Sequence, residues 1–226
     1  MGYLLLEGGA EFGGPMREPD LKAIELAGGF EAPIRIIPTA AAPDNNDQRA
    51  GNNGVRWFQS LGAKDVGSLP LIDKASANDE SLAKSLREAK LIYMLGGFTG
   101  YLGETLQGSN AWQAVLEAYA TGAVVAGSSA GAMVMCEFYY DPSRGQVIEG
   151  LNLVPNSLVL PHHNTFGKSW ASRLLEISRV TLVGIDEGTG MLDDGAGLWT
   201  VYGAGDVTLY RNQEVEIHPT GRSFSV

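Results

Sequence analysis

Short apolar runs alternate with segments of helical periodicity through the first 130 residues of the chain. The apolar runs are continuous, which is the pattern of strands buried on both faces. They lie at residues 3–6, 34–37, 66–72, 91–95 and 123–126. The segments between them carry apolar residues three and four positions apart and end near glycines, so they predict helices. These helices lie at residues 19–27, 47–61, 80–89 (with Asn78 as N-cap) and 101–120.

This alternating order predicts an α/β fold with three layers, in which helices flank a mostly parallel sheet. In such a sheet, ligands bind beyond the carboxyl ends of the strands. Four short segments follow predicted strands, so we expect them to gather at that edge. They are Gly8-Gly9, Thr39, Gly96-Gly97 and Ser129.

The last third of the chain has a different pattern. Two strands are predicted at residues 157–160 and 182–185, with a helix at 170–177 between them. Strands at 198–202, 207–211 and 214–218 then follow with short turns, so we expect an antiparallel meander attached to the main sheet. No stretch has the composition of a linker, and 226 residues with 44% apolar residues can bury one core. Residues 1–226 are therefore expected to form a single domain with a C-terminal antiparallel extension.

The turn Gly127-Ser128-Ser129-Ala130-Gly131 is the first candidate for chemistry. A buried strand precedes it, and a helix-compatible segment at residues 130–138 follows it. This strand–turn–helix order is the setting of a nucleophile elbow, which exposes its central serine above a helix N-terminus. Ser129 is therefore the candidate nucleophile, and the Ala130 amide is a candidate oxyanion donor. The alternative is a glycine-rich helix cap in which Ser128 or Ser129 has no chemical role.

A serine nucleophile needs a base, and the base needs an acceptor that orients it. His162 and His163 stand together after a predicted strand, at the edge where the site is expected. Glu187 follows the next strand and is the candidate acceptor, with Asp186 and Asp141 as the other acids.

An alternative catalytic triad, with its residues in a different order along the chain, is also possible. Ser129, then Asp186 or Asp194, then His218 would match the order of the α/β-hydrolases. It would place the histidine within a strand of the C-terminal meander and not in a loop after a parallel strand. We therefore favour the order serine, histidine, glutamate.

The formal net charge of −10 argues against nucleic acid and against an anionic membrane as the main partner. The single cysteine, Cys136, excludes an intramolecular disulfide, and a buried apolar role suits its place in the predicted helix.

The N-terminus does not resemble a signal peptide and no apolar run is long enough to span a bilayer, so a cytoplasmic protein is expected. No spacing of ligands suggests a metal, and we expect no cofactor. The sequence is compatible with a homodimer.

Three separated segments together resemble a known family. They are residues 124–132 around Ser129, residues 160–165 around His162, and residues 183–189 around Glu187. In this order they are similar to the serine peptidase family of dipeptidase E (aspartyl dipeptidase) and cyanophycinase, the serine branch of the class I glutamine amidotransferase-like fold. The resemblance runs from the first strand to about residue 193.

The resemblance implies a catalytic triad of Ser129, His162 and Glu187, with hydrolysis through an acyl-enzyme. It also implies that the Gly97 amide joins that of Ala130 in an oxyanion hole. In family members an aromatic residue often follows the histidine, whereas this chain has His163, which stays a rival for the base. This chain also departs from the family at Phe98-Thr99-Gly100-Tyr101, residues that would border the substrate, so the resemblance implies the hydrolase class but not the family's specificity.

The resemblance further implies a small peptide as substrate, and dipeptidase E acts on dipeptides with an N-terminal aspartate. A buried aspartate side chain needs a cation. Arg173 is the first candidate, and Arg144 and Lys168 are weaker ones. Phe98, Thr99 and His163 are further candidates for substrate contact. The alternatives are another amidase or esterase of the same fold, a cyanophycinase-like enzyme, and a binding module without catalysis.

Overall fold

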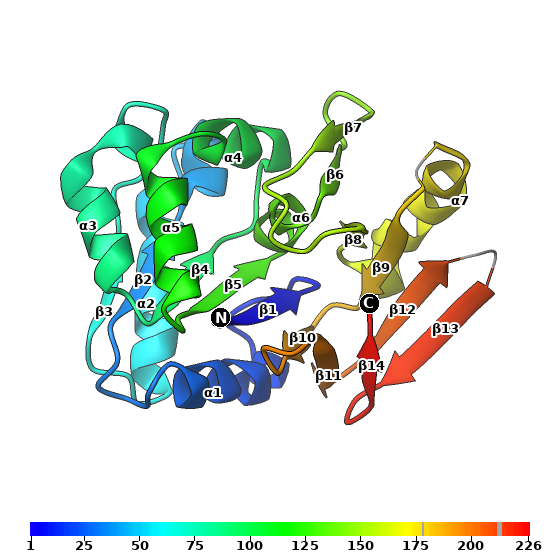
Figure 1. Cartoon of the computed structure of the whole chain (residues 1–226), viewed down its shortest axis with the longest axis horizontal. Helices are drawn as coiled ribbons and strands as arrows, with labels where there is room; N and C mark the ends of the chain where they lie inside the picture. The colour runs from blue at the N-terminus through cyan, green and yellow to red at the C-terminus, as the bar shows by residue number, and fades with distance from the viewer. Residues whose placement is uncertain (178, 212–213) are drawn as a thin grey trace.

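The computed structural model describes residues 1–177, 179–211 and 214–226. The described chain forms an eight-stranded sheet, a four-stranded sheet and a two-stranded ribbon (Figure 1). In spatial order the large sheet consists of β14 (Ser223–Ser225), β11 (Leu198–Gly203), β10 (Thr189–Asp193), β1 (Tyr3–Glu7), β5 (Val124–Ser128), β4 (Leu91–Met94), β2 (Ile34–Ile37) and β3 (Val66–Ser68). The small sheet consists of β13 (Glu214–Pro219), β12 (Asp206–Arg211), β9 (Thr181–Ile185) and β8 (Ser157–Leu160). The ribbon pairs β6 (Phe138–Asp141) with β7 (Gln146–Glu149).

In the part of the chain that the structure describes, seven α-helices and several short helical turns connect these strands. The α-helices are α1 (Arg17–Leu26), α2 (Asp47–Ser60), α3 (Glu80–Glu88), α4 (Thr99–Leu106), α5 (Asn110–Ala120), α6 (Ala130–Met135) and α7 (Lys168–Ile177). The short turns are η1 (Gly14–Met16), η2 (Thr39–Asp44), η3 (Ser76–Asn78) and the π-helical η4 (His163–Gly167).

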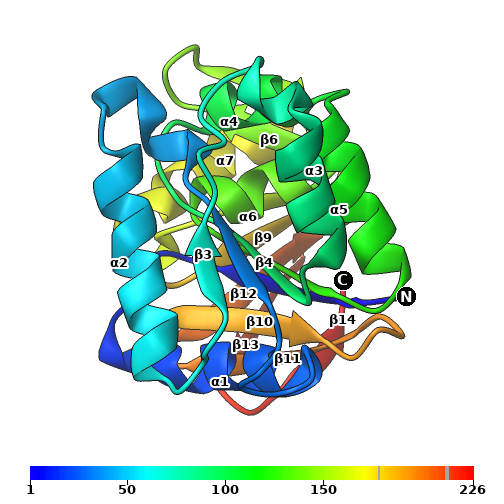
Figure 2. The same ribbon diagram turned by 90° about the vertical axis from the view of Figure 1, so that its left-hand side faces the viewer.

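The large sheet is parallel from β1 to β3, and β10 pairs with β1 in the antiparallel sense. Alternate residues of each strand supply the two faces. Leu4 and Leu6 of β1 pack in the apolar cluster that contains α3, α5 and α6, whereas Leu5 packs in the cluster of α1 and α2. Figure 2 shows the sheet between α2 on one side and α3 with α5 on the other. The predicted α/β class, with helices on both faces of a mostly parallel sheet, is confirmed.

The C-terminal region differs from the expected meander. β11 joins the large sheet beside β10, whereas β12 and β13 belong to the small sheet beside β9. From β9 onward the chain crosses between the sheets three times, at residues 186–188, 204–205 and 220–222. The expected single meander is therefore divided, with β10 and β11 paired in the large sheet and β12 and β13 paired in the small one.

Several predicted boundaries were wrong for local reasons. The expected helix at residues 101–120 is two helices, because Gly108 has a φ of 64° and Ser109 caps α5 through its bond from the Trp112 amide. The helix after the serine turn ends at Met135, and Phe138 begins the ribbon. Asp79, not Asn78, caps α3.

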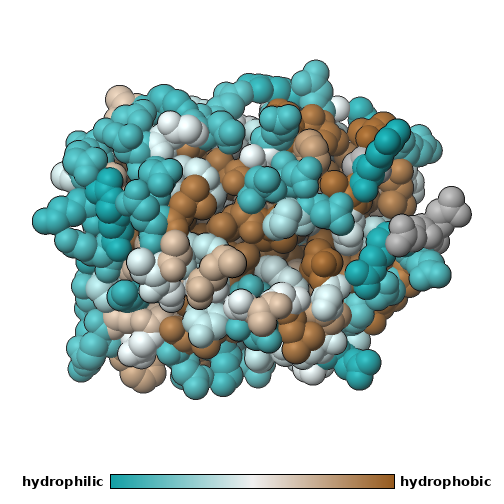
Figure 3. Space-filling model, in the orientation of Figure 1, coloured by the Kyte–Doolittle hydropathy of each residue, from teal (hydrophilic) through white to brown (hydrophobic). Residues whose placement is uncertain are grey.

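No helix among the described residues is long and apolar enough to cross a membrane. Figure 3 shows apolar surface gathered in the middle of one face, with polar side chains around it.

Candidate active site

Ser129 stands in a sharp turn between β5 and α6, with φ 49° and ψ −110°. A positive φ costs a residue with a side chain about 1 kcal/mol or more, so the turn must be held by its surroundings. The Ser129 amide donates to the main-chain oxygen of Glu7 in β1, and the Ser129 carbonyl accepts from Met133 in α6. The serine side chain is thereby presented at the carboxyl edge of the sheet.

Two glycines make room for this turn. A Cβ on Gly127 would lie 2.5 Å from the carbonyl carbon of Gly131, and a Cβ on Gly131 would lie 2.3 Å from the main-chain oxygen of Met94. Both contacts are with backbone, which cannot move aside as a flexible side chain can. The turn therefore requires glycine at both positions, because a side chain at either would collide with backbone.

His162 lies beside Ser129, with its Nε2 3.0 Å from the serine Oγ. Its backbone is left-handed, with φ 51° and ψ 39°, and its amide donates to the main-chain oxygen of Gly8. Gly9 leaves space for the ring, because a Cβ there would lie 2.2 Å from the imidazole Cε1. Phe166 stacks on the ring with centroids 4.9 Å apart. The imidazole is thus fixed by contacts on several sides.

Glu187 lies on the far side of the same ring, with its Oε1 2.7 Å from His162 Nδ1. It stands at the crossing from β9 to β10, and its amide donates to the Asn164 side chain. When Nδ1 carries the ring proton and donates it to this carboxylate, Nε2 is left as an acceptor for the Ser129 hydroxyl. Such an arrangement can activate the serine as a nucleophile.

Two main-chain amides belong to segments that meet at the serine. Ala130 is the first residue of α6, so its N–H has no acceptor within the helix. Gly96 lies against the nucleophile, since a Cβ there would be 3.2 Å from the Ser129 Cβ, and Gly97 follows it with φ 139°. Amides in these positions can donate to a negatively charged oxygen.

His163 points away from this group. Its ring is buried, with Nε2 2.9 Å from the Tyr210 hydroxyl and Nδ1 3.4 Å from Asp186 Oδ1. Burial lowers the pKa of this histidine. The alternatives of His163 as base and as substrate contact were wrong, because the chain turns between the two histidines and sends the second ring into the small sheet.

The remaining alternatives are also separated from Ser129. His218 stacks on Phe224 at 4.2 Å, and Asp194 accepts from the amides of its own turn, so the α/β-hydrolase order is wrong. Asp141 binds Ser143 and lies 3.5 Å from Arg144.

Cys136 is fully buried, and burial raises the pKa of its thiol to about 11. It therefore has the buried apolar role that the sequence suggested.

Two cavities lie on either side of Phe98, whose side chain is 43% exposed. One, of about 380 Å³, is lined by residues of α4 and of the β6–β7 turn, including Arg144. The other, of about 310 Å³, is lined by Glu11 and by residues of η2. Thr99 borders the first cavity, but its hydroxyl lies 3.6 Å from the Met133 sulfur, inside the protein.

Arg173 does not line either cavity. It is exposed on α7 and donates to the main-chain oxygen of Gly145, so the structure gives no support to its expected role as the cation for the substrate. Arg144 does line the first cavity, where it pairs with Glu104 at 2.5 Å and with Asp141. Lys168 is exposed at the start of α7.

Four groups near the site were missed by sequence reasoning. Phe166 and Asn164 hold His162 and Glu187, and only their place just after the two histidines could have indicated them. Glu11 accepts a hydrogen bond from the Ser128 hydroxyl at 3.0 Å. Glu7 is buried beneath the serine turn, and its short apolar strand gave no sign of a charged role.

Glu7 and Asp20 form a buried pair of carboxyl groups. The Tyr93 hydroxyl donates to Glu7, and the Trp57 indole donates to Asp20 at 2.7 Å. Within the described chain, the second oxygen of each carboxyl has no other donor, and the two groups are within hydrogen-bonding reach of one another. Burial raises the pKa of Glu7 well above its ordinary value and that of Asp20 to about 7. We therefore expect the pair to share a proton near neutral pH.

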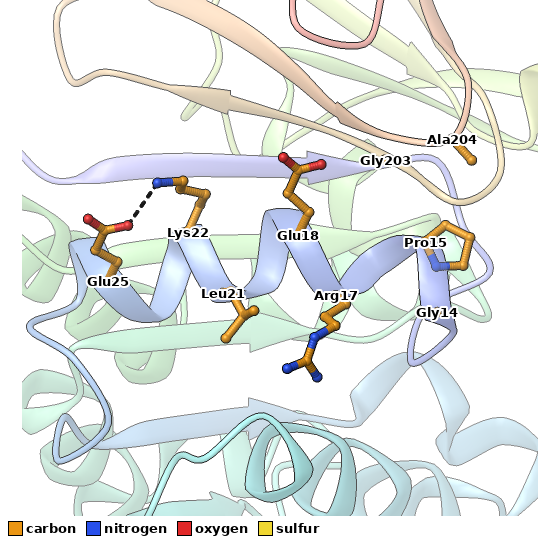
Figure 4. Close-up of a pocket in the computed structure, with 9 residues that line it drawn as sticks. All are labelled: Gly14, Pro15, Arg17, Glu18, Leu21, Lys22, Glu25, Gly203 and Ala204. Atoms are coloured by element: carbon orange, nitrogen blue, oxygen red, sulfur yellow. Dashed lines mark hydrogen bonds and ion pairs between the residues drawn. The ribbon is translucent and has the colours of Figure 1, made fainter.

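A larger groove, of about 670 Å³, runs along α1 toward Gly203 and Ala204. Figure 4 shows Glu18 and Lys22 on the side of α1 that faces this turn, with the Lys22–Glu25 ion pair beside them. The groove does not include Ser129, His162 or Glu187. Across residues 1–177, 179–211 and 214–226, no three His, Cys, Asp or Glu side chains are grouped to hold a metal ion.

Comparison with known proteins shows the family of the chain. Residues 4–199 match the sequence profile of peptidase family S51. The cyanophycinase of Synechococcus elongatus is 29% identical over 231 residues, which cover 95% of this chain and 69% of that protein. The cyanophycinase of Geminocystis herdmanii is 28% identical over 235 residues, covering 97% of this chain and 84% of that protein.

Solved structures share the fold. The crystal structure of a peptidase from an acI-B1 Actinobacterium has a TM-score of 0.90 and 30% identity, and covers 100% of this chain and 97% of that one. A peptidase E protein from Listeria monocytogenes has a TM-score of 0.64 at 22% identity, covering 98% of this chain and 100% of that one. The latter shows the fold alone. The family resemblance of the three motifs is confirmed, and the chain belongs to peptidase family S51 as a serine-type peptidase.

Proposed function

We propose that this peptidase hydrolyses small peptides, and dipeptides in particular, through a triad of Ser129, His162 and Glu187. The observation that carries the proposal is the continuous hydrogen-bonded path from Glu187 Oε1 to His162 Nδ1 at 2.7 Å, and from His162 Nε2 to Ser129 Oγ at 3.0 Å. Such a path is the geometric requirement for a serine activated by a base that a third group orients.

In the proposed reaction His162 takes the proton of Ser129 as Oγ attacks the peptide carbonyl. Glu187 holds the imidazole and stabilises its charged form. His162 then gives the proton to the leaving amine, which leaves an acyl-enzyme. Water hydrolyses this ester with His162 again acting as base, which restores Ser129.

The Gly97 and Ala130 amides would bind the oxyanion that forms at each attack. Ala130 follows Ser129 directly, Gly97 follows the Gly96 that lies against Ser129, and the α6 N-terminus adds a favourable dipole. Loss of one such donor typically costs about 3 kcal/mol of transition-state stabilisation. These two donors therefore account for a large share of the proposed rate enhancement.

The cavities beside Phe98 support a small substrate, since volumes of about 310 and 380 Å³ lie at the lower end for small-molecule sites. They give less support to an N-terminal aspartate. Arg144, the cation in their lining, already pairs with Glu104 and Asp141. We therefore propose a neutral or basic first residue in preference to the Asp-X specificity that the family resemblance suggested.

A second candidate is hydrolysis of an isopeptide bond in a cyanophycinase-like reaction. The similarity to cyanophycinases over nearly the whole chain favours it. The residues of the proposed triad would act in the same way, and only the substrate contacts would differ.

The test is a substrate panel of Ala-X, Arg-X, Asp-X and isopeptide-linked dipeptides, with release of the amino acids followed by mass spectrometry. Ser129→Ala should abolish turnover and also labelling by a fluorophosphonate probe, while the fold stays intact by circular dichroism. Ser172→Ala, at an exposed serine on α7, is the matched control and should keep both. Turnover in Ser129→Ala close to that of the wild type would refute the proposal.

A further inference from the structure

Glu11 is the acidic side chain that lies against the serine turn. Its Oε2 accepts from the Ser128 hydroxyl at 3.0 Å. Gly96 lies between Glu11 and Ser129. A Cβ on Gly96 would be 3.3 Å from Glu11 Oε1 and 3.2 Å from the Ser129 Cβ. A carboxylate oxygen and the proposed nucleophile therefore border the same small space.

The loop that carries Glu11 is held in one conformation by strain and by packing. The residues on either side of it, Ala10 and Phe12, have φ values of 59° and 63°. Left-handed backbone at a residue with a side chain is uncommon, and it persists where the surroundings enforce it. Phe12 supplies that anchor, because its ring packs 5.7 Å from Tyr93 and 6.4 Å from Trp57. Glu11 is therefore fixed beside the serine and does not move freely in solvent.

The charge around Glu11 favours a cation. In the described chain its hydrogen-bond partner is a neutral hydroxyl, and no ion pair involves it. The cavity of about 310 Å³ that it lines has one other charged side chain, Asp44, which is also acidic. A carboxylate in such a cavity gains most from a positively charged hydrogen-bond donor.

The chemistry of a dipeptide supplies a donor at the right place. Its free α-ammonium is bonded to the carbon next to the carbonyl carbon that the serine attacks, so two bonds separate the two atoms. Any group that binds this ammonium must lie beside the nucleophile.

We propose that the Glu11 carboxylate binds the free α-ammonium of the residue whose carbonyl Ser129 attacks. This rests on the proposed function, and it makes the enzyme an exopeptidase that releases N-terminal residues. Glu11 would bind a positively charged group of the substrate, which could be the α-ammonium or a basic side chain on the same residue. Acetylation of the substrate's N-terminus removes the charge of the α-ammonium and leaves that of the side chain, so it distinguishes the two.

The test compares Ala-p-nitroanilide, N-acetyl-Ala-p-nitroanilide and N-acetyl-Arg-p-nitroanilide. The wild type should prefer the first. Glu11→Gln should lower its kcat/KM by roughly 10- to 100-fold, the range of a lost charged hydrogen bond. Hydrolysis of the acetylated compounds should change little, because the glutamine still accepts from Ser128. Glu18→Gln, at an exposed glutamate of α1, is the matched control and should behave as wild type.

A second measurement needs no turnover. Alaninamide should slow fluorophosphonate labelling of the wild type, and N-acetylalaninamide should not; in Glu11→Gln the two should act alike. If alaninamide and N-acetylalaninamide slowed labelling of the wild type equally, the role of Glu11 would be overturned. Labelling at Ser129 in the same experiment would still support the proposed hydrolase activity. Preference for N-acetyl-Arg-p-nitroanilide would also overturn it, in favour of a side-chain site. Absence of labelling in the wild type would refute the proposed function, and this inference with it.

Discussion

The buried carboxyl pair of Glu7 and Asp20 should make the protein less stable as the pH rises through neutrality. Both groups are fully buried, and burial raises both pKa values, that of Asp20 to about 7. The folded chain therefore keeps protons that the unfolded chain releases near pH 4. Because the folded state binds more protons in this range, the free energy of unfolding must fall as the pH rises from about 4 to 7.

The size of the effect follows from the shift. For Asp20 the pKa rises from 3.8 to about 7, which is about three pH units. At 1.36 kcal/mol for each unit, this amounts to roughly 4 kcal/mol by pH 8. That is a large part of the 5 to 15 kcal/mol that typically stabilises a folded domain. Glu7 acts in the same direction.

Glu7→Gln isolates this contribution. A glutamine has nearly the same shape, can accept from Tyr93 and can donate to an ionised Asp20, so no proton has to be shared. In urea unfolding at pH 5, 6, 7 and 8, the free energy of unfolding should fall steeply with pH for the wild type and less steeply for the variant. The variant should be the more stable of the two at pH 8.

The exposed Glu18→Gln variant controls for the loss of one surface charge. Equal slopes for the wild type and Glu7→Gln would show that the pair does not titrate in this range. A large loss of stability in Glu7→Gln at every pH would show instead that the glutamine does not fit, and the pH slope of the wild type would then carry the test.

Three further changes test other parts of the structure. Gly131→Ala would bring a Cβ to 2.3 Å from backbone of β4, so urea unfolding should show a loss of about 1 to 3 kcal/mol, and fluorophosphonate labelling should slow; wild-type values would contradict the tight packing. Tyr210→Phe removes the hydrogen bond to His163 and should cost roughly 1 kcal/mol of stability without changing the rate of labelling. A slowed rate there would show that His163 contributes to the reaction. Glu187→Gln should lower kcat by roughly a thousand-fold or more, since the amide cannot orient His162 in the same tautomer, and an unchanged kcat would remove Glu187 from the proposed triad.

The elements that sequence reasoning identified are those with a strong local pattern. Residues 34–37 and 157–160 were predicted as strands with the bounds observed, because each is a short apolar run between turn residues. β10 was missed, because Thr189–Asp193 is a short run between the Asp186-Glu187-Gly188 turn and the glycines at 195 and 197, and it has no clear strand pattern of its own. The assignment of strands to two sheets depends on how the crossings pack, and no local pattern expresses that.

The site shows the same division. Ser129, His162 and Glu187 could be named from motifs, and the structure brings them together. His163 and Arg173 could not be judged, since one ring turns inward after a left-handed residue and one helix faces away from the serine. Glu11 had no signal at all, because left-handed backbone at Ala10 and Phe12 sets its direction.

The crossing between the sheets has a consequence for how the enzyme fails. Ser129 ends a strand of the large sheet, whereas His162 and Glu187 follow β8 and β9 of the small sheet. The distance between His162 Nε2 and Ser129 Oγ therefore depends on how the small sheet packs against the large one. Slight loosening of the small sheet would separate the two atoms and stop the reaction while the helices around the large sheet stay folded. On heating, activity should vanish several degrees before the helical circular dichroism signal does.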